Sequence, residues 1–266
     1  MRLDVYLAEN GLVKSRAAAK ELIVSGQVSA DGKTVLKPSF DVDEDCSVKI
    51  TGGQLRYVGR GGLKLEKALD VFGINLSERV CIDIGASTGG FTDCMLQNGA
   101  AYVYAVDVGH GQLDDKLIND SRVLNMEKTN ILELSADDFP KETSFISADV
   151  SFISLKHILP KIKELLPESG KAAVLIKPQF EAGKANIGKS GIVRDRKVHA
   201  SVLSDIVSFC FSIGLEVSDL THSPVTGGSG TDGNIEYLAC LRRGSAHRDF
   251  DFGEIVRNAF GELKKT

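Results

Sequence analysis

The sequence predicts an α/β protein in which a doubly wound sheet follows a small N-terminal domain. From Leu63 onward, helical segments alternate with short apolar strands, which is typical of a parallel sheet covered by helices. Charged residues stand directly after several of these strands, at the edge where such sheets bind ligands. A Gly-rich stretch separates this region from a short segment that has its own apolar pattern, so two domains are expected.

Composition restricts the class of protein. The chain has 266 residues, and no apolar run approaches the roughly 20 residues that a membrane-spanning helix needs. The first residues lack an apolar signal segment. The five cysteines are odd in number and form no C-x-x-C pair, which supports neither a disulfide framework nor a metal site. We therefore expect a cytoplasmic protein without a membrane partner or bound metal.

Charge leaves nucleic-acid binding open. The net charge is −4, which by itself disfavours a polyanionic partner. Residues 1–67, however, carry 11 Lys/Arg against 9 Asp/Glu. Local basic clusters, and not the total charge, decide phosphate binding, so charge alone leaves the question open.

Residues 1–50 predict two helices followed by a small sheet. Ser15 is a suitable N-cap and Gly26 a suitable C-terminal stop for the second helix. Asp31-Gly32 is a hairpin turn. The expected elements are a short helix within 3–11, a helix over 16–25, hairpin strands at 27–30 and 34–36, and a last strand at 46–50.

The order of residues in this segment carries more information than the elements. The segment contains Arg2-Leu3-Asp4, Ser15-Arg16-x-x-Ala19, Ile23-x-x-Gly26-x-Val28 and Asp31-Gly32. This order resembles the S4-type RNA-binding module over residues 2–50. The resemblance implies that Lys14, Arg16 and Lys20 meet structured RNA, because a helix start with adjacent cations suits phosphate groups. A solvated helix face is the alternative.

The domain limits follow from these patterns. We expect an S4-type domain over residues 1–54, a linker over 55–62 and a large domain over 63–266. Arg56 and Arg60 would contact RNA that crosses both domains, and a plain Gly-rich hinge is the alternative.

The large domain is expected to bring several charged residues to one edge of its sheet. Helices are expected over 63–72, 91–96 and 198–213, and strands at 80–84, 102–106, 123–125, 145–148, 171–176, 215–220 and 236–241. A charged residue stands at the carboxyl end of four of these strands. These residues are Asp83, Asp107, Asp149 and Lys177. Because the carboxyl ends of parallel strands meet at one edge, this pattern predicts a single ligand site.

The Gly-rich turn after the first of these strands favours S-adenosylmethionine as the ligand. A glycine turn alone does not discriminate, because NAD enzymes have one too. Asp83 can organise the turn and attract the cationic methionine end, whereas it would repel a pyrophosphate. Asp107 suits the ribose diol of either cofactor. The residues expected to bind the cofactor are Asp83, Gly85, Ala86, Ser87, Gly89, Gly90, Phe91, Asp107, Val108 and Asp149.

Five longer motifs then suggest a family. They are DIGASTGGFT at 83–92, DVGHGQL at 107–113, DVSFISL at 149–155, KPQFE at 177–181 and GNIEY at 233–237. Together they resemble the TlyA family, FtsJ-like rRNA methyltransferases with an N-terminal S4-type domain whose members are often labelled hemolysins. The resemblance implies a Rossmann-like S-adenosylmethionine-dependent methyltransferase fold with a small α+β domain. It also implies ribose 2'-O-methylation of a cytidine in 23S or 16S rRNA, with ribosomal RNA or subunits as partners.

The resemblance also assigns a catalytic set. FtsJ-like enzymes use a Lys-Asp-Lys-Glu tetrad, which maps onto Lys64, Asp149, Lys177 and Glu236. A ribose 2'-OH is a weak acid and needs a base or a cationic field. A lysine can accept a proton only in its neutral form, which requires a lowered pKa. Lys177 is assigned as base or alkoxide stabiliser, and the other lysine and the glutamate are expected to orient it and the ribose.

Other functions remain as alternatives. A base methyltransferase usually has an N-P-P-Y-like motif or paired catalytic cysteines, and the fourth strand ends in DVSFISL instead. A pore-forming hemolysin needs long apolar or amphipathic segments, which are missing. An RNA-binding protein with an inactive second domain is disfavoured by the complete tetrad. Segments 180–195 and 223–234 are candidate lids, or simply solvated loops.

Overall fold

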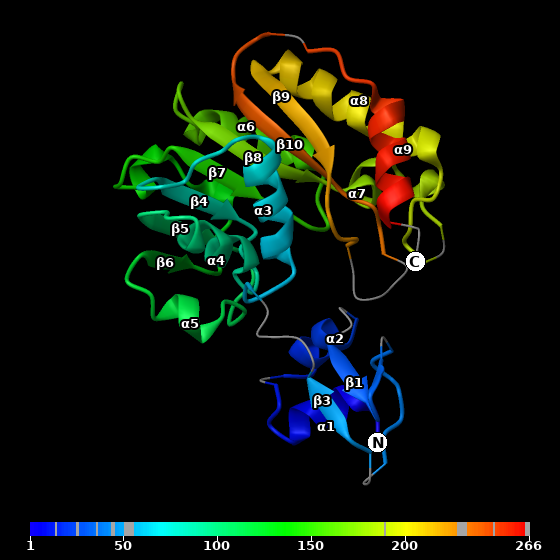
Figure 1. Cartoon of the computed structure of the whole chain (residues 1–266). Helices are drawn as coiled ribbons and strands as arrows, with labels where there is room; N and C mark the ends of the chain where they lie inside the picture. Colours follow the sequence, from blue (N-terminus) through cyan, green and yellow to red (C-terminus); the bar gives the residue numbers. More distant parts are fainter. Residues whose placement is uncertain are drawn as a thin grey trace.

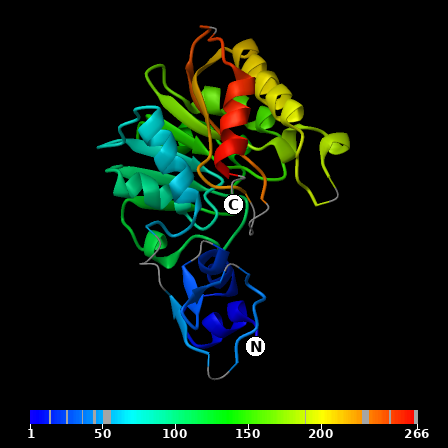
Figure 2. The same ribbon diagram turned by 45° about the vertical axis from the view of Figure 1, so that its right-hand side comes forward.

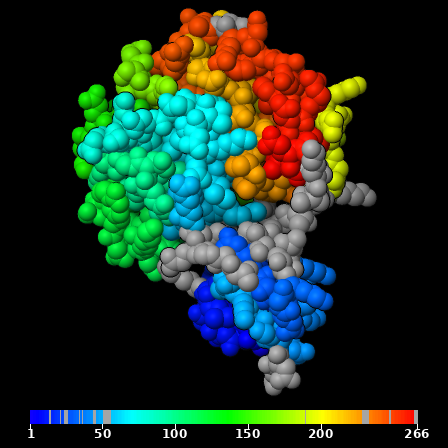
Figure 3. All heavy atoms as spheres, viewed as in Figure 1, coloured from blue at the N-terminus to red at the C-terminus, as the bar shows by residue number. Residues whose placement is uncertain are grey.

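The structure is a computed structural model that describes residues 1–13, 15–24, 27–35, 37–43, 46–50, 56–188, 190–227, 233–246 and 248–263. Figures 1 and 2 show a small N-terminal domain at one end of a larger α/β domain. In the space-filling view the small domain, in blue, projects from the larger one (Figure 3). No described helix is long and apolar enough to cross a membrane.

The small domain consists of two helices and a three-stranded antiparallel sheet, as predicted. Its elements are α1 (Leu3–Glu9), α2 (Arg16–Val24), β1 (Val28–Ala30), β2 (Lys33–Thr34) and β3 (Val48–Ile50), with strand order β2-β1-β3. The Ser15 hydroxyl accepts a hydrogen bond from the Ala18 amide, as expected of an N-cap. Asp31 and Gly32 both have positive φ, which is the conformation of a type I′ hairpin turn. Ser25, Gly26 and Leu36 lie outside the described residues.

Seven strands form the sheet of the large domain. They are β4 (Val80–Ile84), β5 (Tyr102–Val106), β6 (Val123–Met126), β7 (Phe145–Ala148), β8 (Lys171–Ile176), β9 (Leu215–His222) and β10 (Tyr237–Arg243), in the order β6-β5-β4-β7-β8-β10-β9. The first five are parallel, which confirms the predicted doubly wound sheet. Strand β10 runs antiparallel to both of its neighbours, a reversal that the sequence did not predict.

Helices cover both faces of this sheet. They are α3 (Gly61–Val71), α4 (Gly90–Gln97), α5 (Asp115–Ile118), α6 (Leu155–Leu165), α7 (Pro178–Glu181), α8 (Arg196–Ser212) and α9 (Phe252–Leu263), with short 3-10 turns at Ile131–Glu133, Ala136–Asp138 and Lys184–Asn186. Helices α3 and α4 share one core with the sheet, and α6, α8 and α9 share the other. Helices α6 and α9 were not predicted. Pro160 lies inside α6, and a proline is usually taken to interrupt a helix.

The pleat of β4 shows how the sheet divides its side chains. Cys81 packs in the core beneath α3 and α4, whereas Ile82 and Ile84 pack in the core beneath α6 and α8. Asp83 therefore points to the α4 side, because successive strand residues face opposite sides of a sheet.

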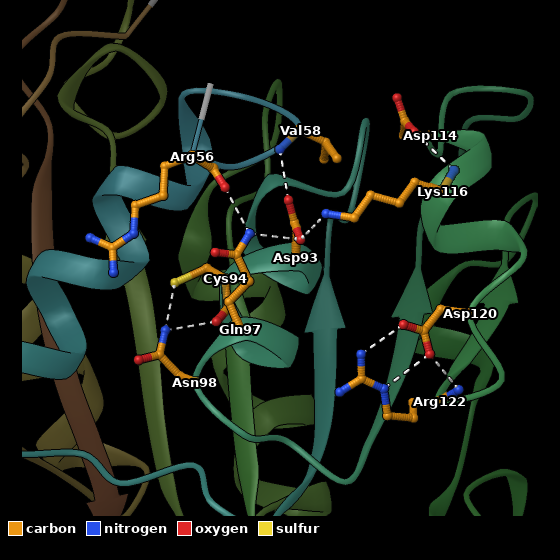
Figure 4. Close-up of polar contacts among 10 residues, drawn as sticks. All are labelled: Arg56, Val58, Asp93, Cys94, Gln97, Asn98, Asp114, Lys116, Asp120 and Arg122. Carbon is orange, nitrogen blue, oxygen red and sulfur yellow. Dashed lines mark hydrogen bonds and ion pairs between the residues drawn. The ribbon is translucent and has the colours of Figure 1, made fainter. Parts of the chain in front are cut away.

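Residues 56–58, which lead into the large domain, are hydrogen-bonded to side chains of α4 (Figure 4). The Asp93 carboxylate accepts hydrogen bonds from the Val58 amide at 2.9 Å and from Lys116 Nζ at 3.1 Å. The Gln97 side chain donates to the Arg56 carbonyl at 2.7 Å. Tyr57 is buried against Gly62, where an added Cβ would lie 2.2 Å from the ring. Residues 56–62, expected as linker, thus pack as part of the large domain.

Candidate active site

Four charged residues from distant segments meet at the carboxyl edge of the sheet. Lys64 lies on α3, Asp149 follows β7, Lys177 follows β8 and Glu236 precedes β10. Both lysines and the glutamate are more than nine-tenths buried. The structure therefore brings together all four residues of the predicted tetrad.

Asp149 bridges the two lysines. Its Oδ2 lies 3.5 Å from Lys64 Nζ, and its Oδ1 pairs with Lys177 Nζ. Lys64 Nζ also donates to Glu236 Oε2 at 2.7 Å, and Lys177 Nζ donates to Ser151 Oγ at 2.9 Å. Two cations and two carboxylates thus balance one another, as burial of charge requires.

These ion pairs determine two of the charge states. Burial alone would lower the pKa of Lys64, but the carboxylates of Asp149 and Glu236 outweigh burial and raise that pKa. Burial alone would raise the pKa of Asp149, but the two ammonium groups outweigh it and lower that pKa. Lys64 therefore remains an ammonium and Asp149 a carboxylate at neutral pH, so neither accepts a proton there.

The Gly-rich turn after β4 comes close to this cluster. Gly85 has φ +82°, and a Cβ there would lie 2.6 Å from the Asp149 carbonyl oxygen. Gly89 has φ +94°, and a Cβ there would lie 2.1 Å from Leu117. Only glycine tolerates both the backbone conformation and the contact. The turn therefore packs directly against the segment that carries Asp149.

Two further carboxylates fix the neighbouring loops. Asp107 accepts hydrogen bonds from the amides of Ser87 at 2.8 Å and Gly109 at 2.7 Å. Glu127 accepts hydrogen bonds from the backbone amides of Gln112 and Leu113. The hydrogen bond from Gln112 is the main reason that the pKa of Glu127 falls to about 2. Asp107 was predicted from its place at the end of β5. Glu127 follows β6 directly, so the same strand-end rule could have found it.

Two cavities lie against the turn. The turn cavity, of about 230 Å³, is lined by Gly59–Gly61, Lys64, Gly85–Thr88, Gly90, Phe91, Asp149, Ser151, Lys177 and Val225–Gly227. The apolar cavity, of about 570 Å³, is lined by Ile84, Gly85, Ser87, Val106–Gly109, Gln112, Thr129–Leu132, Asp149–Ile153 and Ile158. One is small and rich in polar groups, and the other is large and mainly apolar. Together they suit an elongated ligand with a charged end and an aromatic end.

Eight of the ten predicted cofactor residues line these cavities, and two do not. Asp83 is fully buried below the turn, where it accepts hydrogen bonds from the hydroxyls of Thr92 at 2.7 Å and Ser147 at 2.8 Å. Gly89 packs under the turn against Leu117. Asp83 therefore holds the turn from beneath, as expected of a residue that organises it, and its side chain faces the α4 core and lines neither cavity.

A third cavity is also lined by members of the tetrad. This outer cavity, of about 470 Å³, is lined by Lys64, Ser151, Phe152, Lys177, Gln179, Phe180, Ile187, Gly191, Gly227, Asn234 and Glu236. Phe152 is 94% exposed and has φ +64°, and its ring centroid lies 5.4 Å from that of Phe180. Gln179 donates to Glu236 Oε1 at 3.3 Å.

Several lining residues were not predicted. Residues 130–132 line the apolar cavity, and no sequence signal distinguishes that loop. Residues 225–227 line the turn cavity and belong to the segment 223–234, which the sequence marked as a candidate lid without assigning single residues. Ser151 and Gln179 fall within the motifs DVSFISL and KPQFE, so the motifs marked their positions without assigning them a role.

One of the predicted RNA-contacting residues of the small domain, Arg16, lies beside a buried acid. Asp4 is fully buried and pairs with Arg2 at 2.9 Å and with Arg16 at 3.2 Å. The hydrogen bond from Arg2 is the main reason that the pKa of Asp4 is lowered. Both arginines keep about half of their side-chain surface exposed. Lys20 is half-buried on α2, and Lys14 lies outside the described residues.

The two arginines predicted for the linker have separate positions. Arg56 pairs with Glu66 and lies 5.4 Å from the centre of the Tyr57 ring. Arg60 precedes α3 and lines the turn cavity. The structure therefore places Arg60 beside the candidate site and Arg56 on the outer surface of α3.

Comparison with known proteins identifies both domains. Residues 57–243 match the model of the FtsJ-like methyltransferases, and residues 1–45 match the S4 domain. The chain belongs to the TlyA family of FtsJ-like methyltransferases.

The relatives of this TlyA-family chain span nearly its whole length. It is 48% identical over 260 residues to the Bacillus subtilis protein named "Putative rRNA methyltransferase YqxC", which covers 96% of this chain and 92% of that protein. It is 38% identical over 242 residues to the 16S/23S rRNA (cytidine-2'-O)-methyltransferase TlyA of Mycobacterium tuberculosis, covering 91% and 89% of the two chains. A solved structure named "Putative hemolysin from Streptococcus thermophilus" has a TM-score of 0.79 and 45% identity, covering 100% of this chain and 97% of that one.

The burial of Asp83 predicts a specific pH dependence of stability. Burial raises the pKa of Asp83 to about 6, from 3.8. The folded state therefore binds the Asp83 proton more tightly than the unfolded state. The protonated carboxyl contributes its full stability to the fold below about pH 4, and this stability is lost as the pH rises through about 6. Asp83→Asn has no carboxyl to ionise and does not lose this stability. Its free energy of unfolding should therefore rise relative to that of the parent by on the order of 2 to 3 kcal/mol between about pH 4 and about pH 7. Urea unfolding of both proteins across this range measures the difference, and parallel pH profiles would contradict the prediction.

Proposed function

We propose that this chain transfers a methyl group from S-adenosylmethionine to a ribose 2'-hydroxyl of ribosomal RNA, with a cytidine as the target. The observation that carries the proposal is the buried Lys64–Asp149–Lys177 cluster at the point where the turn cavity and the outer cavity meet. The names of two relatives, which specify rRNA (cytidine-2'-O)-methylation, supply the substrate.

The cavities fit the cofactor by their chemistry. Gly85, Ala86 and Ser87 would hold the methionine end in the turn cavity, where Asp149 provides negative charge. Asp107 would receive the ribose diol, and the loop at 130–132, through Ile131 and Leu132, would cover the adenine. When bound, S-adenosylmethionine supplies an electrophilic methyl group on a sulfonium. The protein's own contribution is to place a nucleophile beside it and to remove a proton.

Lys177 is the residue best placed to act on the acceptor. Lys64 is held between two carboxylates and Asp149 between two ammonium groups, so both have fixed charges. Lys177 lines the turn cavity and the outer cavity. Pro178 at the first position of α7 turns the chain directly after it and fixes its direction. Lys177 therefore serves as proton acceptor or as cationic stabiliser of the ribose oxygen.

The S4 domain would anchor the RNA away from the reaction. The buried Asp4 holds the guanidinium groups of Arg2 and Arg16 together on one side of the small domain. Fixed cations of this kind bind phosphates without reading sequence. Binding and chemistry are thus assigned to different domains.

The test of the function is methyl transfer to ribosomal RNA. Purified protein is incubated with S-adenosylmethionine and ribosomal subunits, and the RNA is then hydrolysed with alkali. A 2'-O-methyl blocks attack of the ribose oxygen on the adjacent phosphate, so one alkali-resistant dinucleotide containing cytidine is expected. A methylated nucleotide that remains alkali-sensitive would indicate base methylation instead. Absence of S-adenosylmethionine binding by calorimetry, even with RNA present, would also refute the proposal.

Replacement of Lys177 should separate chemistry from binding. Lys177→Ala should reduce the rate of methyl transfer by about 100-fold to 10,000-fold, because it removes the proton acceptor. Lys177→Arg should not restore the rate if the group accepts a proton, because guanidinium stays charged. Lys171→Ala, at the exposed start of the same strand β8, is the matched control and should keep full activity. Unchanged activity in Lys177→Ala would remove this residue from the mechanism.

Charge removal on α2 should weaken RNA binding in a salt-dependent way. The Arg16→Ala, Lys20→Ala double variant should bind ribosomal RNA less tightly, and each lost phosphate contact should reduce the salt slope by about one unit. Binding of S-adenosylmethionine should not change. Lys33→Ala with Lys49→Ala removes the same charge from the sheet side of the domain and serves as control. Equal loss of RNA affinity in both double variants would show that only net charge matters.

A further inference from the structure

Ser151 occupies the one position where all three cavities meet. Among the residues that the structure describes, it is the only one that lines the turn cavity, the apolar cavity and the outer cavity. It is exposed to these spaces, whereas Lys177 beside it is 7% exposed. If the donor occupies the first two cavities and the acceptor the third, the reacting atoms come together next to the Ser151 side chain.

The hydroxyl of Ser151 is already joined to the candidate base. Its Oγ lies 2.9 Å from Lys177 Nζ, and the other side of that nitrogen pairs with Asp149. A neutral amine has one lone pair. With an N–H directed to Asp149, the lone pair can face Ser151, and 2.9 Å suits a hydrogen bond in either direction. A serine hydroxyl has one proton and two acceptor sites, so it can bond to Lys177 and to a second group at once.

We propose that Ser151 is a catalytic residue that accepts a hydrogen bond from the ribose 2'-OH and passes its proton to Lys177. This inference rests on the proposed function. In the step, the 2'-oxygen bonds to the methyl carbon as the carbon–sulfur bond breaks and its electron pair stays on sulfur. The ribose proton moves to Ser151 Oγ, and the Ser151 proton moves to Lys177 Nζ, which must have released its ammonium proton to solvent before the step. Lys177 ends as an ammonium paired with Asp149, and charge is conserved.

The relay also orients the nucleophile. When the 2'-OH proton is bonded to Ser151, the lone pairs of the 2'-oxygen remain free to attack the methyl group of the donor. Orientation of this kind contributes to the rate independently of the proton transfer. This contact is assigned to Ser151 because Ser151 is exposed, whereas Lys177 is nearly buried and is held by Asp149.

A binding experiment tests the contact without turnover. The RNA fragment that contains the mapped target is prepared with a ribose or a 2'-deoxyribose at that nucleotide, and affinities are measured with S-adenosylhomocysteine present. The parent should bind the hydroxyl form about threefold to tenfold more tightly, the worth of one hydrogen bond. Ser151→Ala should bind the two forms equally. Ser208→Ala, an exposed serine on α8, should keep the parent's preference. An undiminished preference in Ser151→Ala would overturn the proposal.

Kinetics test the relay itself. In single turnover Ser151→Ala should lose about 100-fold in rate, with cofactor and RNA affinities within about threefold of the parent's. Ser151→Thr retains the hydroxyl and should recover most of the rate. In mixtures of H₂O and D₂O the parent rate should depend on deuterium content along a curve, because two protons move, and Ser151→Ala should give a straight line. A linear parent profile, or a rate for Ser151→Ala within about twofold of the parent's, would overturn the relay. Methylation of a base by the parent would instead overturn the proposed function, and the relay with it.

Discussion

The candidate site depends on one partly buried carboxylate, that of Asp149, between two lysines. An isolated charge in this position would be strongly unfavourable, and removal of one partner from a buried pair commonly costs about 3 to 5 kcal/mol. Asp149 is stable as a carboxylate only because Lys64 and Lys177 both approach it, and Lys64 is in turn paired with Glu236. The cluster therefore ties α3, β7, β8 and the start of β10 into one arrangement. The same interactions that hold these segments fix the protonation of two members and leave Lys177 beside the reacting space.

The rest of the large domain supplies the positions that this cluster requires. Parallel strands β7 and β8 present Asp149 and Lys177 at one edge, and the reversed strand β10 begins at that same edge, so that Glu236 can reach Lys64. Gly85 allows the turn after β4 to touch the backbone of Asp149. Beneath the turn, Asp83 is bonded to hydroxyls on α4 and β7 and joins the two. The hydrogen bonds of Asp83 and the close contact at Gly85 fix the position of the turn. Methyl transfer between two bound molecules requires such fixed positions.

The two domains divide the work between affinity and chemistry. In the small domain a buried acid, Asp4, positions arginines whose outer surfaces remain in solvent. In the large domain a partly buried acid, Asp149, positions lysines that line the turn cavity and the outer cavity. The physical device is the same, but exposure differs: the guanidinium groups face solvent and suit phosphates, whereas the lysines are nearly buried and line the cavities of the candidate site. Ser151, at the junction of the cavities, would connect the acceptor to this desolvated cluster.

The sequence by itself determined the order of elements and the residue types of the site. Apolar periodicity located all seven strands of the large sheet, because short buried strands between turn residues are a local signal. The strand-end rule placed Asp107, Asp149 and Lys177 at one edge, and the motifs added Lys64 and Glu236 through resemblance. Tertiary structure decided what local pattern does not encode. The direction of β10 depends on its neighbours, and helix α6 forms despite Pro160 because its apolar face packs on the sheet. Asp83 was expected to face the ligand, yet the pleat of β4 turns it into the core, where Thr92 and Ser147 receive it. The place of Ser151 between three cavities is a property of assembled surfaces, which arises only when loops from separate strands converge.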